Sequence, residues 1–442
     1  MEKFEGIWYN LGVKILGIET SCDETAAAVV EDGKQILSNV VVSQIDIFAE
    51  YGGVIPEVAA RNHLEVMMPV VKKALKDADC SWDEIDAIAV TYAPGLLGSL
   101  LIGTLTARTL AILHNKPLYA VHHLKSHVYA NWLDEAKLKP VLSSAGLENS
   151  EASYAGRPGE PSASQTNLSA SSGIYASDFS NHSMLQKKPV SALPSFPVLA
   201  LVISGGHTQI LNMPAHNKFE IVGTTRDDAI GECFDKVAKI LGLPYPGGPS
   251  IAKAAEGVVE PATKCSAGHE GLAQVTRNVP EEHVAAGSTT SGNSHKYILP
   301  HPKVEGLDFS FSGLKTAVLR AVQKEVGVPI SYPSHKLKEL LSPQQVADFA
   351  ASFQKTAVDI LVEKLNKALK MYPDTKSVVI AGGVSANKAL REALPDAYFP
   401  APSLSGDNGA MVAAAGYFEI QSGVKPTDPY KLNIYPRISI EK

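Results

Sequence analysis

Residues Lys14 to Gly33 read KILGIETSCDETAAAVVEDG: an apolar segment, a short polar turn and a second apolar segment. Apolar runs of this length, bounded by turn residues, are typical of buried strands. The same figure returns as FPVLALVISGGHTQILNM between Phe196 and Met213. Each copy is followed by helical sequence and by further strands, among them IDAIAVTYAPG and KSVVIAGGVSAN. The repetition predicts two related α/β blocks.

Composition favours a soluble protein with a sizeable core. The chain has 442 residues, of which 45% are hydrophobic, and its net charge of −6 does not by itself indicate nucleic-acid binding. The four cysteines show no CxxC spacing, which suits a reducing compartment. The N-terminus has no apolar signal segment, and the longest apolar run, from Ala93 to Leu113, is interrupted by Gly98, Gly103 and Arg108. We therefore expect a cytoplasmic protein without membrane association, in which this run forms a buried helix.

Two segments differ in composition from the rest of the chain. Residues 143–193 and 260–295 are rich in Ser, Ala, Gly and Pro or lack any periodicity, and we expect both to be disordered surface insertions. Removing them leaves a first lobe over 13–135 and a second over 196–405. The remaining segment, 406–442, is expected to pack back on the first lobe.

The polar turns of the two blocks are the first candidates for ligand binding. In TSCDET, Asp23 and Glu24 present carboxylates beside converging backbone amides, an arrangement that suits phosphate binding. In SGGHT, Gly205 and Gly206 let a ligand approach the backbone, and His207 projects from the strand end. Ordinary hairpin tips remain an alternative explanation for both turns.

Two diglycines add to these candidates. Gly382-Gly383 follows an apolar strand, where open α/β sheets bind nucleotides, and the Asn387 amide lies within the next turn. Ser385 as a helix N-cap is the alternative explanation of that turn. A second diglycine, Gly247-Gly248, stands between prolines. No GxxxxGK[ST] or GxGxxG sequence occurs, which disfavours the P-loop and Rossmann nucleotide folds.

The segment VHHLKSHVYA, Val121 to Ala130, holds three histidines. His123 and His127 are four apart, share one face of the predicted helix and form a half-site for a first-row metal. Two ordinary helix-surface histidines are an equal alternative. Leu124 stands where a zinc protease of HExxH type needs its glutamate. Asp407 in SGDNGAMVAAAG is a candidate third ligand, unless it only caps the following helix; such a set suits iron(II) or zinc better than magnesium.

Taken in order, these segments resemble the bacterial TsaD family, the tRNA N6-adenosine threonylcarbamoyltransferases once described as O-sialoglycoprotein endopeptidases. The resemblance rests on GIETSCDET, YGGVIPEVAARNHLE, APGLLGSLLIG, HHLKSH, VISGGHT, DDAIGECFDKVAKILGLPYPGGP, FSFSGLKTAV, AGGVSANKALR and GDNGAMVA. It covers nearly the whole chain outside the two insertions, which are unusual for the family. It implies the two-lobed actin-like ATPase fold, made of duplicated RNase H-like lobes.

The resemblance also implies an activity. The threonylcarbamoyl group of threonylcarbamoyl-AMP would pass to N6 of the adenosine 3′ of the anticodon, in tRNAs that read ANN codons, with release of AMP. One Fe²⁺, with Zn²⁺ as the alternative, would be held by His123, His127 and Asp407. Asp23 and Glu24 match acidic positions that the family needs for activity, and either could accept the proton of the attacking amine. The implied partners are tRNA, a TsaB-like paralogue and a TsaE-like ATPase.

By the same resemblance, one set of residues would contact the adenylate, its threonylcarbamoyl group or ATP. These residues are Ser204, Gly205, Gly206, His207, Thr208, Asp235, Gly248 and Asn387.

The chain departs from the family between the metal histidines, where Lys125 and Ser126 replace the usual acidic and small residues. Because Lys125 lies on another helix face, we expect metal binding to persist. Competing functions are an ATP-dependent small-molecule kinase of the same fold and a non-catalytic scaffold paralogue. The C-terminal KPTDPYKLNIYPR is either a basic patch for tRNA or a tail docked on the body.

Overall fold

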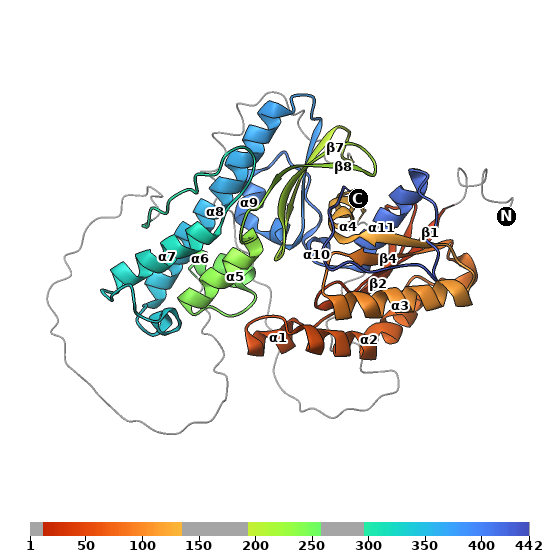
Figure 1. The fold of residues 1–442 in the computed structure, drawn as a ribbon, viewed down its shortest axis with the longest axis horizontal. Coiled ribbons are helices and arrows are strands. Elements are labelled where there is room, and N and C mark those ends of the chain that lie inside the picture. The colour runs from red at the N-terminus through yellow and green to blue at the C-terminus, as the bar shows by residue number, and fades with distance from the viewer. Residues whose placement is uncertain (1–11, 135–192, 258–295, 442) are drawn as a thin grey trace, which may run out of the picture.

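The chain forms two α/β lobes that lie side by side (Figure 1). The structure, a computed structural model, describes residues 12–134, 193–257 and 296–441. The expected insertions, 143–193 and 260–295, lie outside these described residues apart from Leu193. Within the described residues no helix has the length and apolar character needed to cross a membrane.

The first lobe is a five-stranded sheet in the order β3-β2-β1-β4-β5. Its strands are β1 (Lys14–Glu19), β2 (Glu24–Glu31), β3 (Gln35–Ser43), β4 (Ala87–Ala93) and β5 (Leu118–His122). β1, β2 and β3 are antiparallel, whereas β1, β4 and β5 run parallel. The helical elements of this part are α1 (Ile45–Tyr51), α2 (Pro56–Asp77), η1 (Trp82–Glu84), α3 (Leu97–Leu113), α4 (His123–Tyr129) and η2 (Ala130–Trp132). The parallel strands bring their carboxyl ends, and the residues that follow them, to one edge of the sheet.

The second lobe has a four-stranded sheet in the order β8-β7-β6-β9. Its strands are β6 (Val198–Ile203), β7 (Thr208–Ala215), β8 (Lys218–Thr224) and β9 (Ser377–Ala381). The helical elements are α5 (Ile230–Leu241), α6 (Gly247–Ala255), α7 (Ser312–Glu325), η4 (Ser334–Glu339), α8 (Pro343–Met371), η5 (Gly383–Ala386), α9 (Lys388–Ala393) and α10 (Pro402–Ser405). α8 begins at the capping box that Ser342 and Gln345 form around Pro343.

Both lobes repeat one topology. In each, three consecutive antiparallel strands are extended by a parallel strand on the far side of the first: β4 beside β1, and β9 beside β6. The polar turns TSCDET and SGGHT occupy the same place, between the first and second strands. This duplication confirms the predicted two-lobed, actin-like arrangement of RNase H-like units.

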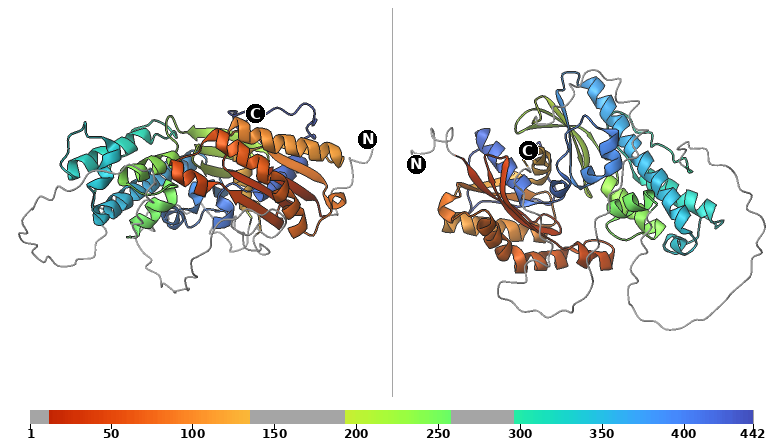
Figure 2. Two further views of the ribbon diagram at one scale, coloured as in Figure 1. Left: turned by 90° about the horizontal axis from the view of Figure 1, so that it is seen from below. Right: turned by 180° about the vertical axis from the view of Figure 1, so that it is seen from behind.

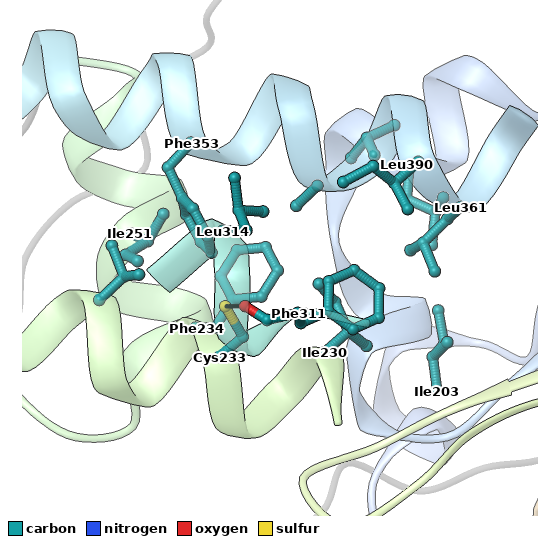
Figure 3. Close-up of a cluster of buried hydrophobic side chains, with 14 of the residues drawn as sticks. Ile203, Ile230, Cys233, Phe234, Ile251, Phe311, Leu314, Phe353, Leu361 and Leu390 are labelled. Atoms are coloured by element: carbon teal, nitrogen blue, oxygen red, sulfur yellow. Dashed lines mark hydrogen bonds between the residues drawn. The ribbon is translucent and has the colours of Figure 1, made fainter. Parts of the chain in front are cut away.

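Three apolar clusters hold the lobes. One fills the space between the sheet and helices of the second lobe, where Phe234, Phe311 and Phe353 meet aliphatic side chains (Figure 3). Another lies between the first sheet and helices α2 and α3. The third joins the lobes, because it unites buried residues of β1, α4 and β6 with those of the final helix, α11 (Gly409–Gln421). Helix α11 packs on β1 so closely that a Cβ at Gly17 would come within 2.2 Å of the Gly409 carbonyl oxygen.

The C-terminal segment lies against both lobes (Figures 1 and 2). After α11, the chain donates from Thr427 N to the Leu118 carbonyl and from Tyr435 N to the Tyr92 carbonyl. Near its end, Glu441 accepts a hydrogen bond from Ile221 N of β8. The backbone of KPTDPYKLNIYPR is therefore docked on the body of the protein, as one of the two interpretations predicted. The side chain of Arg437 is exposed.

Helix α3 differs from the sequence expectation. Its apolar run was predicted to be buried, but Leu97, Leu101 and Leu105 are 58%, 43% and 43% exposed. Large apolar residues occur on more than one side of the helix, and only its inner face, with Ala107 and Leu110, packs in the core. An exposed apolar stripe on a surface helix is a feature of interaction sites.

Candidate functional site

The chain passes from β5 directly into α4, and His122 stands at the junction. Its Nδ1 accepts a hydrogen bond from Leu124 N at 3.2 Å, so His122 is the N-cap of α4. Its Nε2 therefore carries the hydrogen and donates it to the Ile438 carbonyl oxygen at 3.3 Å. Burial is the main reason that the pKa of His122 falls to about 3. Both ring nitrogens are engaged, which leaves His122 outside any metal site.

His123, His127 and Asp407 lie together. The two imidazole rings are 4.6 Å apart and nearly perpendicular. Asp407 Oδ1 is 3.0 Å from His127 Nε2 and 3.6 Å from His123 Nε2. One ligand atom from each residue falls within 4.8 Å of the others, a set that could hold a metal ion. The residues predicted to share an ion are thus brought together from positions far apart in the sequence.

The chemistry of this group fits a cation. Nδ1 of His127 is buried without a hydrogen-bond partner, an unusual cost unless another ligand satisfies it, and Nε2 faces the Asp407 carboxylate at 3.0 Å. Burial by itself raises the pKa of the Asp407 carboxyl, but the imidazoles of His123, His127 and His207 lower it to about 2. Burial lowers the pKa of His123, whereas the carboxylates of Asp407 and Glu19 raise it to about 9. Two imidazoles and a carboxylate are ligands that suit iron(II) or zinc.

Asp407 is not the N-cap of the helix that follows it. That position belongs to Asn408, whose Oδ1 accepts from Met411 N at 3.0 Å. The Asn408 amide also donates to the carbonyls of Leu404 and Gly406. Because the neighbouring residue caps α11, the Asp407 carboxylate is left to face the histidines.

Asp23 lies in the turn between β1 and β2, and Glu24 is the first residue of β2. Burial, followed by the nearby charges of Asp23 and Asp407, raises the pKa of Glu24 well above its usual range. Glu24 Oε1 accepts a hydrogen bond from Ser43 Oγ at 3.0 Å. The turn thus carries a carboxyl group that holds a proton more readily than an ordinary glutamate, close to the Asp407 charge.

The SGGHT turn of the second lobe lies near this group, because His207 is influenced by His123, His127 and Asp407. Its backbone closes through Ser204 N and the His207 carbonyl at 2.8 Å, and Thr208 Oγ1 accepts from Ile230 N. Burial lowers the pKa of His207 to about 4, and His123, His127 and Asp407 are the charged groups that influence it. His207 is therefore a neighbour of the three candidate ligands.

The diglycines show a common pattern. A Cβ at Gly247 would come within 2.5 Å of Asp235 Cα, and a Cβ at Gly382 within 2.4 Å of the Ile203 carbonyl. At Gly248 and Gly383, by contrast, a Cβ would meet nothing within 4 Å. Packing thus explains the first glycine of each pair, while the second borders open space. Gly205 and Gly206 border open space in the same way.

Asp235 and Asn387 lie on the second lobe. Asp235 Oδ1 accepts from Gly247 N at 2.7 Å, and burial raises the pKa of this carboxyl. Asn387 rather than Ser385 is the N-cap of α9, with Oδ1 accepting from Leu390 N and Nδ2 donating to Gln354. The alternative of a Ser385 cap was wrong, and the Ser385 hydroxyl is buried without a partner.

Lys125 points away from the histidines, as expected. Its Nζ donates to Asn217 Oδ1 at 3.4 Å and lies 5.6 Å from the centre of the Phe219 ring. Both partners belong to the hairpin that β7 and β8 form.

Sequence reasoning missed two buried residues that hold the site. Glu19, the last residue of β1, contacts His123, and His63 of α2 contacts the TSCDET turn. Glu19 is part of GIETSCDET, where a charged residue ending an apolar strand was the available signal. The signal for His63 was weaker, since it is one histidine within a polar stretch of a long helix.

Comparison with known proteins agrees with this geometry. The family model TsaD, tRNA N6-adenosine threonylcarbamoyltransferase, matches residues 35–150 and 180–414. A protein of that name from Caldicellulosiruptor saccharolyticus is 38% identical over 434 residues, 96% of this chain and 98% of its own length. The chain belongs to the TsaD family. A second TsaD relative, from Symbiobacterium thermophilum, is 39% identical over 420 residues, 93% of each chain.

One solved structure shows a more distant likeness to this TsaD chain. Component A of (R)-2-hydroxyglutaryl-CoA dehydratase from Acidaminococcus fermentans aligns with 93% of it and with 99% of its own length. The sequence identity is 12% and the TM-score 0.39, a likeness too weak to carry an argument. TsaD membership thus rests on the sequence relatives.

Proposed function

We propose that this chain is a tRNA N6-adenosine threonylcarbamoyltransferase. It takes the threonylcarbamoyl group from threonylcarbamoyl-AMP and transfers it to N6 of the adenosine 3′ of the anticodon in tRNAs that read ANN codons. The observation that carries the proposal is the meeting of His123, His127 and Asp407 in a chain with full-length TsaD relatives. A small-molecule kinase or a scaffold, the alternatives left open by the sequence, is not favoured by these relatives.

His123, His127 and Asp407 would hold the metal ion, which we propose to be Fe²⁺, with Zn²⁺ as the alternative. A bound ion supplies Lewis acidity toward the acyl carbonyl and phosphate oxygens of the donor. The residues themselves set its place, because Asp407 Oδ1 lies within 3.6 Å of both Nε2 atoms. Both histidines are buried, whereas the Asp407 side chain is partly exposed.

The second lobe would bind the adenylate. The open space beside Gly205, Gly206, Gly248 and Gly383 supports this part of the proposal, because neither packing nor a positive φ explains glycine at these positions. Glycine lets backbone amides approach phosphate and ribose closely. Ser204, His207, Thr208, Asp235 and Asn387 flank the same space on the basis of the family resemblance. ATP is a further expected ligand of these residues.

Glu24 or Asp23 would accept the proton that the attacking amine loses. The adenosine N6 lone pair attacks the carbamoyl carbon, the bond from that carbon to the phosphate oxygen breaks, and AMP leaves. The amine must lose one proton, and the raised pKa of Glu24 makes its carboxylate a suitable acceptor, with Asp23 as the alternative. Attack by so weak a nucleophile depends on the two reactants being held in line. The target base would have to be splayed out of the anticodon loop to reach this turn.

We propose a TsaB-like paralogue as partner, on the exposed apolar face of α2 and α3. Leu64 and Met68 of α2 are 68% and 41% exposed, beside Leu97, Leu101 and Leu105 of α3. Paired helices that leave such a stripe in water suit a partner that presents a similar helical face. A change of Leu101→Glu should abolish the heterodimer in size-exclusion chromatography, whereas the same change at exposed Met371 should not. A TsaE-like ATPase, tRNA and the cytoplasmic location are proposed from the family alone.

Reconstitution tests the function. Purified protein, threonylcarbamoyl-AMP, the partner proteins and unmodified tRNA should yield threonylcarbamoyladenosine, detected by mass spectrometry of digested tRNA. Asp407→Ala should remove the product while the protein remains folded. Wild-type protein as inert as Asp407→Ala would contradict the proposal, and ATP-dependent phosphorylation of a small metabolite would favour the kinase instead.

A further inference from the structure

Glu19 is a buried acid that the proposed chemistry does not use. It ends β1 with no exposed surface. Oε1 accepts a hydrogen bond from Ser21 N, and Oε2 accepts one from Thr91 Oγ1 of β4, both at 2.6 Å. The same Oε2 lies 3.1 Å from Nδ1 of His123. Three neighbouring strands, β1, β4 and β5, thus bring a carboxylate, a hydroxyl and an imidazole to one edge of the sheet.

This contact fixes the position of the hydrogen on His123. Both Glu19 oxygens act as acceptors, so Nδ1 at 3.1 Å must present a hydrogen to avoid lone-pair repulsion. The Ser21 hydroxyl, also 3.1 Å from Nδ1, is a weaker alternative partner because it is neutral. A neutral imidazole with its hydrogen on Nδ1 has its free lone pair on Nε2, the nitrogen that faces Asp407.

The second imidazole has no such support. Nδ1 of His127 is buried without a hydrogen-bond partner. The two histidines are therefore unequal: Glu19 holds His123 through Nδ1, while no described residue bonds Nδ1 of His127. Thr91, in turn, holds the Glu19 oxygen that meets His123.

We propose that Glu19 is a positioning residue, which holds His123 with its hydrogen on Nδ1 so that Nε2 is presented to the metal ion. This inference rests on the metal centre of the proposed function. A carboxylate behind a ligating histidine fixes its tautomer and ring orientation and strengthens its binding. Glu19 also ties the metal helix α4 to the TSCDET turn, since Ser21 N donates to its other oxygen.

Metal affinity of the full-length chain tests the role. In Glu19→Gln, the amide keeps the size of the side chain but offers only one acceptor oxygen. We expect the Zn²⁺ dissociation constant, measured by competition with a chromophoric chelator, to rise about 10–100-fold. Thr91→Val, which removes the hydroxyl on Oε2, should give a smaller rise. An unchanged dissociation constant in Glu19→Gln would overturn the proposal.

His63→Gln is the matched control. His63 is also buried and also bonds the TSCDET turn, through Thr25 Oγ1 and the Cys22 carbonyl, but it does not touch His123. Its Zn²⁺ affinity should equal that of wild type. An equal loss in His63→Gln and Glu19→Gln would show that any disturbance of the turn weakens the site, which contradicts a specific role for Glu19.

A measurement on the wild type tests the proposal without relying on Glu19→Gln being folded. Nitrogen NMR of the ¹⁵N-histidine-labelled, metal-free chain, recorded above the raised pKa of His123 so that its ring is neutral and assigned with His123→Asn, should show the hydrogen on Nδ1 and none on Nε2. The opposite tautomer would overturn the inference even if Glu19→Gln failed to fold. Absence of Zn²⁺ binding by wild type would also overturn it, whereas Zn²⁺ binding without tRNA modification would defeat only the proposed function.

Discussion

Adjacent histidines at the start of α4 have different partners, and this difference is testable at single residues. His122→Asn keeps an N-cap acceptor for Leu124 N but loses the bond from Nε2 to the Ile438 carbonyl. We expect stability to fall by about 1–2 kcal/mol, as for loss of one buried hydrogen bond, with full metal binding retained. Denaturant unfolding and metal analysis check this. His123→Asn is the comparison, and loss of metal in both variants would contradict the separation of roles.

Asp407 and Asn408 form a second adjacent pair with separate roles. Asp407→Asn removes the charge of the candidate ligand but leaves the α11 cap intact, so bound metal should fall well below one per chain in a folded protein. Asn408→Ser keeps an N-cap acceptor but loses the amide bonds to Leu404 and Gly406, so it should cost roughly 1–2 kcal/mol while metal is retained. Metal analysis and unfolding curves check both. The reverse pattern would mean that Asn408 shapes the site.

At the residue scale, the sequence predicts a contact where the spacing of two residues along one helix determines it. His123 and His127 share a helix face at any α-helical site, so their proximity follows from i, i+4 spacing alone. Glu19 and His63 act through contacts to residues 104 and about 40 positions away, which depend on strand order and helix placement. Whether Asp407 or Asn408 caps α11 is a choice between adjacent, equally suitable residues, which only tertiary contacts decide.

At the scale of elements, α2 connects two surfaces. Its inner face carries His63, which donates from Nε2 to the Cys22 carbonyl at 2.9 Å and accepts from Thr25 Oγ1 at 2.7 Å. Burial lowers the pKa of His63, which favours the neutral ring, and the Cys22 carbonyl requires the hydrogen to be on Nε2. Its outer face carries Leu64, exposed and proposed to meet the partner. The turn with Asp23 and Glu24 is thus held from the helix that the partner would cover.

Loosening this hold should slow the reaction without removing the metal. In His63→Ala, the turn loses both bonds, and small displacements of reacting groups cost up to about 10²-fold in rate. We expect kcat of tRNA modification to fall by at least about tenfold, with little change in KM for tRNA and wild-type metal content. Steady-state kinetics with metal analysis check this. His335→Ala, at an exposed position, is the control. An unaltered kcat in His63→Ala would contradict the role of His63 in holding the TSCDET turn.

Helices and strands could be predicted where a local sequence pattern fits only one type of element. The capping box at Ser342 and the strand-turn-strand repeats are local signals, and the structure has both. The exposure of α3 was not predictable from its sequence, because a helix that is apolar all round gives no sign of which side faces the core. Its outer leucines became visible only once α2 and the sheet occupied the inner side.

At the scale of the whole molecule, an aromatic cluster joins the lobes. His216, in the hairpin between β7 and β8, stacks on Phe418 of α11 at 4.2 Å and meets Phe196 edge-on at 4.5 Å. Tyr129 and Trp132 surround the same ring, and Tyr129 Oη accepts from Asn217 N. The duplicated fold could be predicted from the repeated blocks, but this junction could not, since its members are scattered over nearly 300 positions of sequence.

His216 should make the junction sensitive to acid. Burial, with a contribution from Lys34, lowers its pKa to about 4, against about 6.5 in the unfolded chain. Between these two pKa values, His216 binds a proton in the unfolded chain but not in the folded chain. The free energy of unfolding therefore decreases as pH falls from about 6.5 to 4. His216→Phe keeps a ring in the cluster and removes this titration. Its melting temperature should therefore fall less than that of wild type over the same range, by the equivalent of about 1–3 kcal/mol. Thermal unfolding at each pH measures the difference. His335→Gln, at an exposed position, is the control and should lose stability as wild type does. If the melting temperatures of His216→Phe and wild type fall in parallel, His216 is not the source of the acid sensitivity.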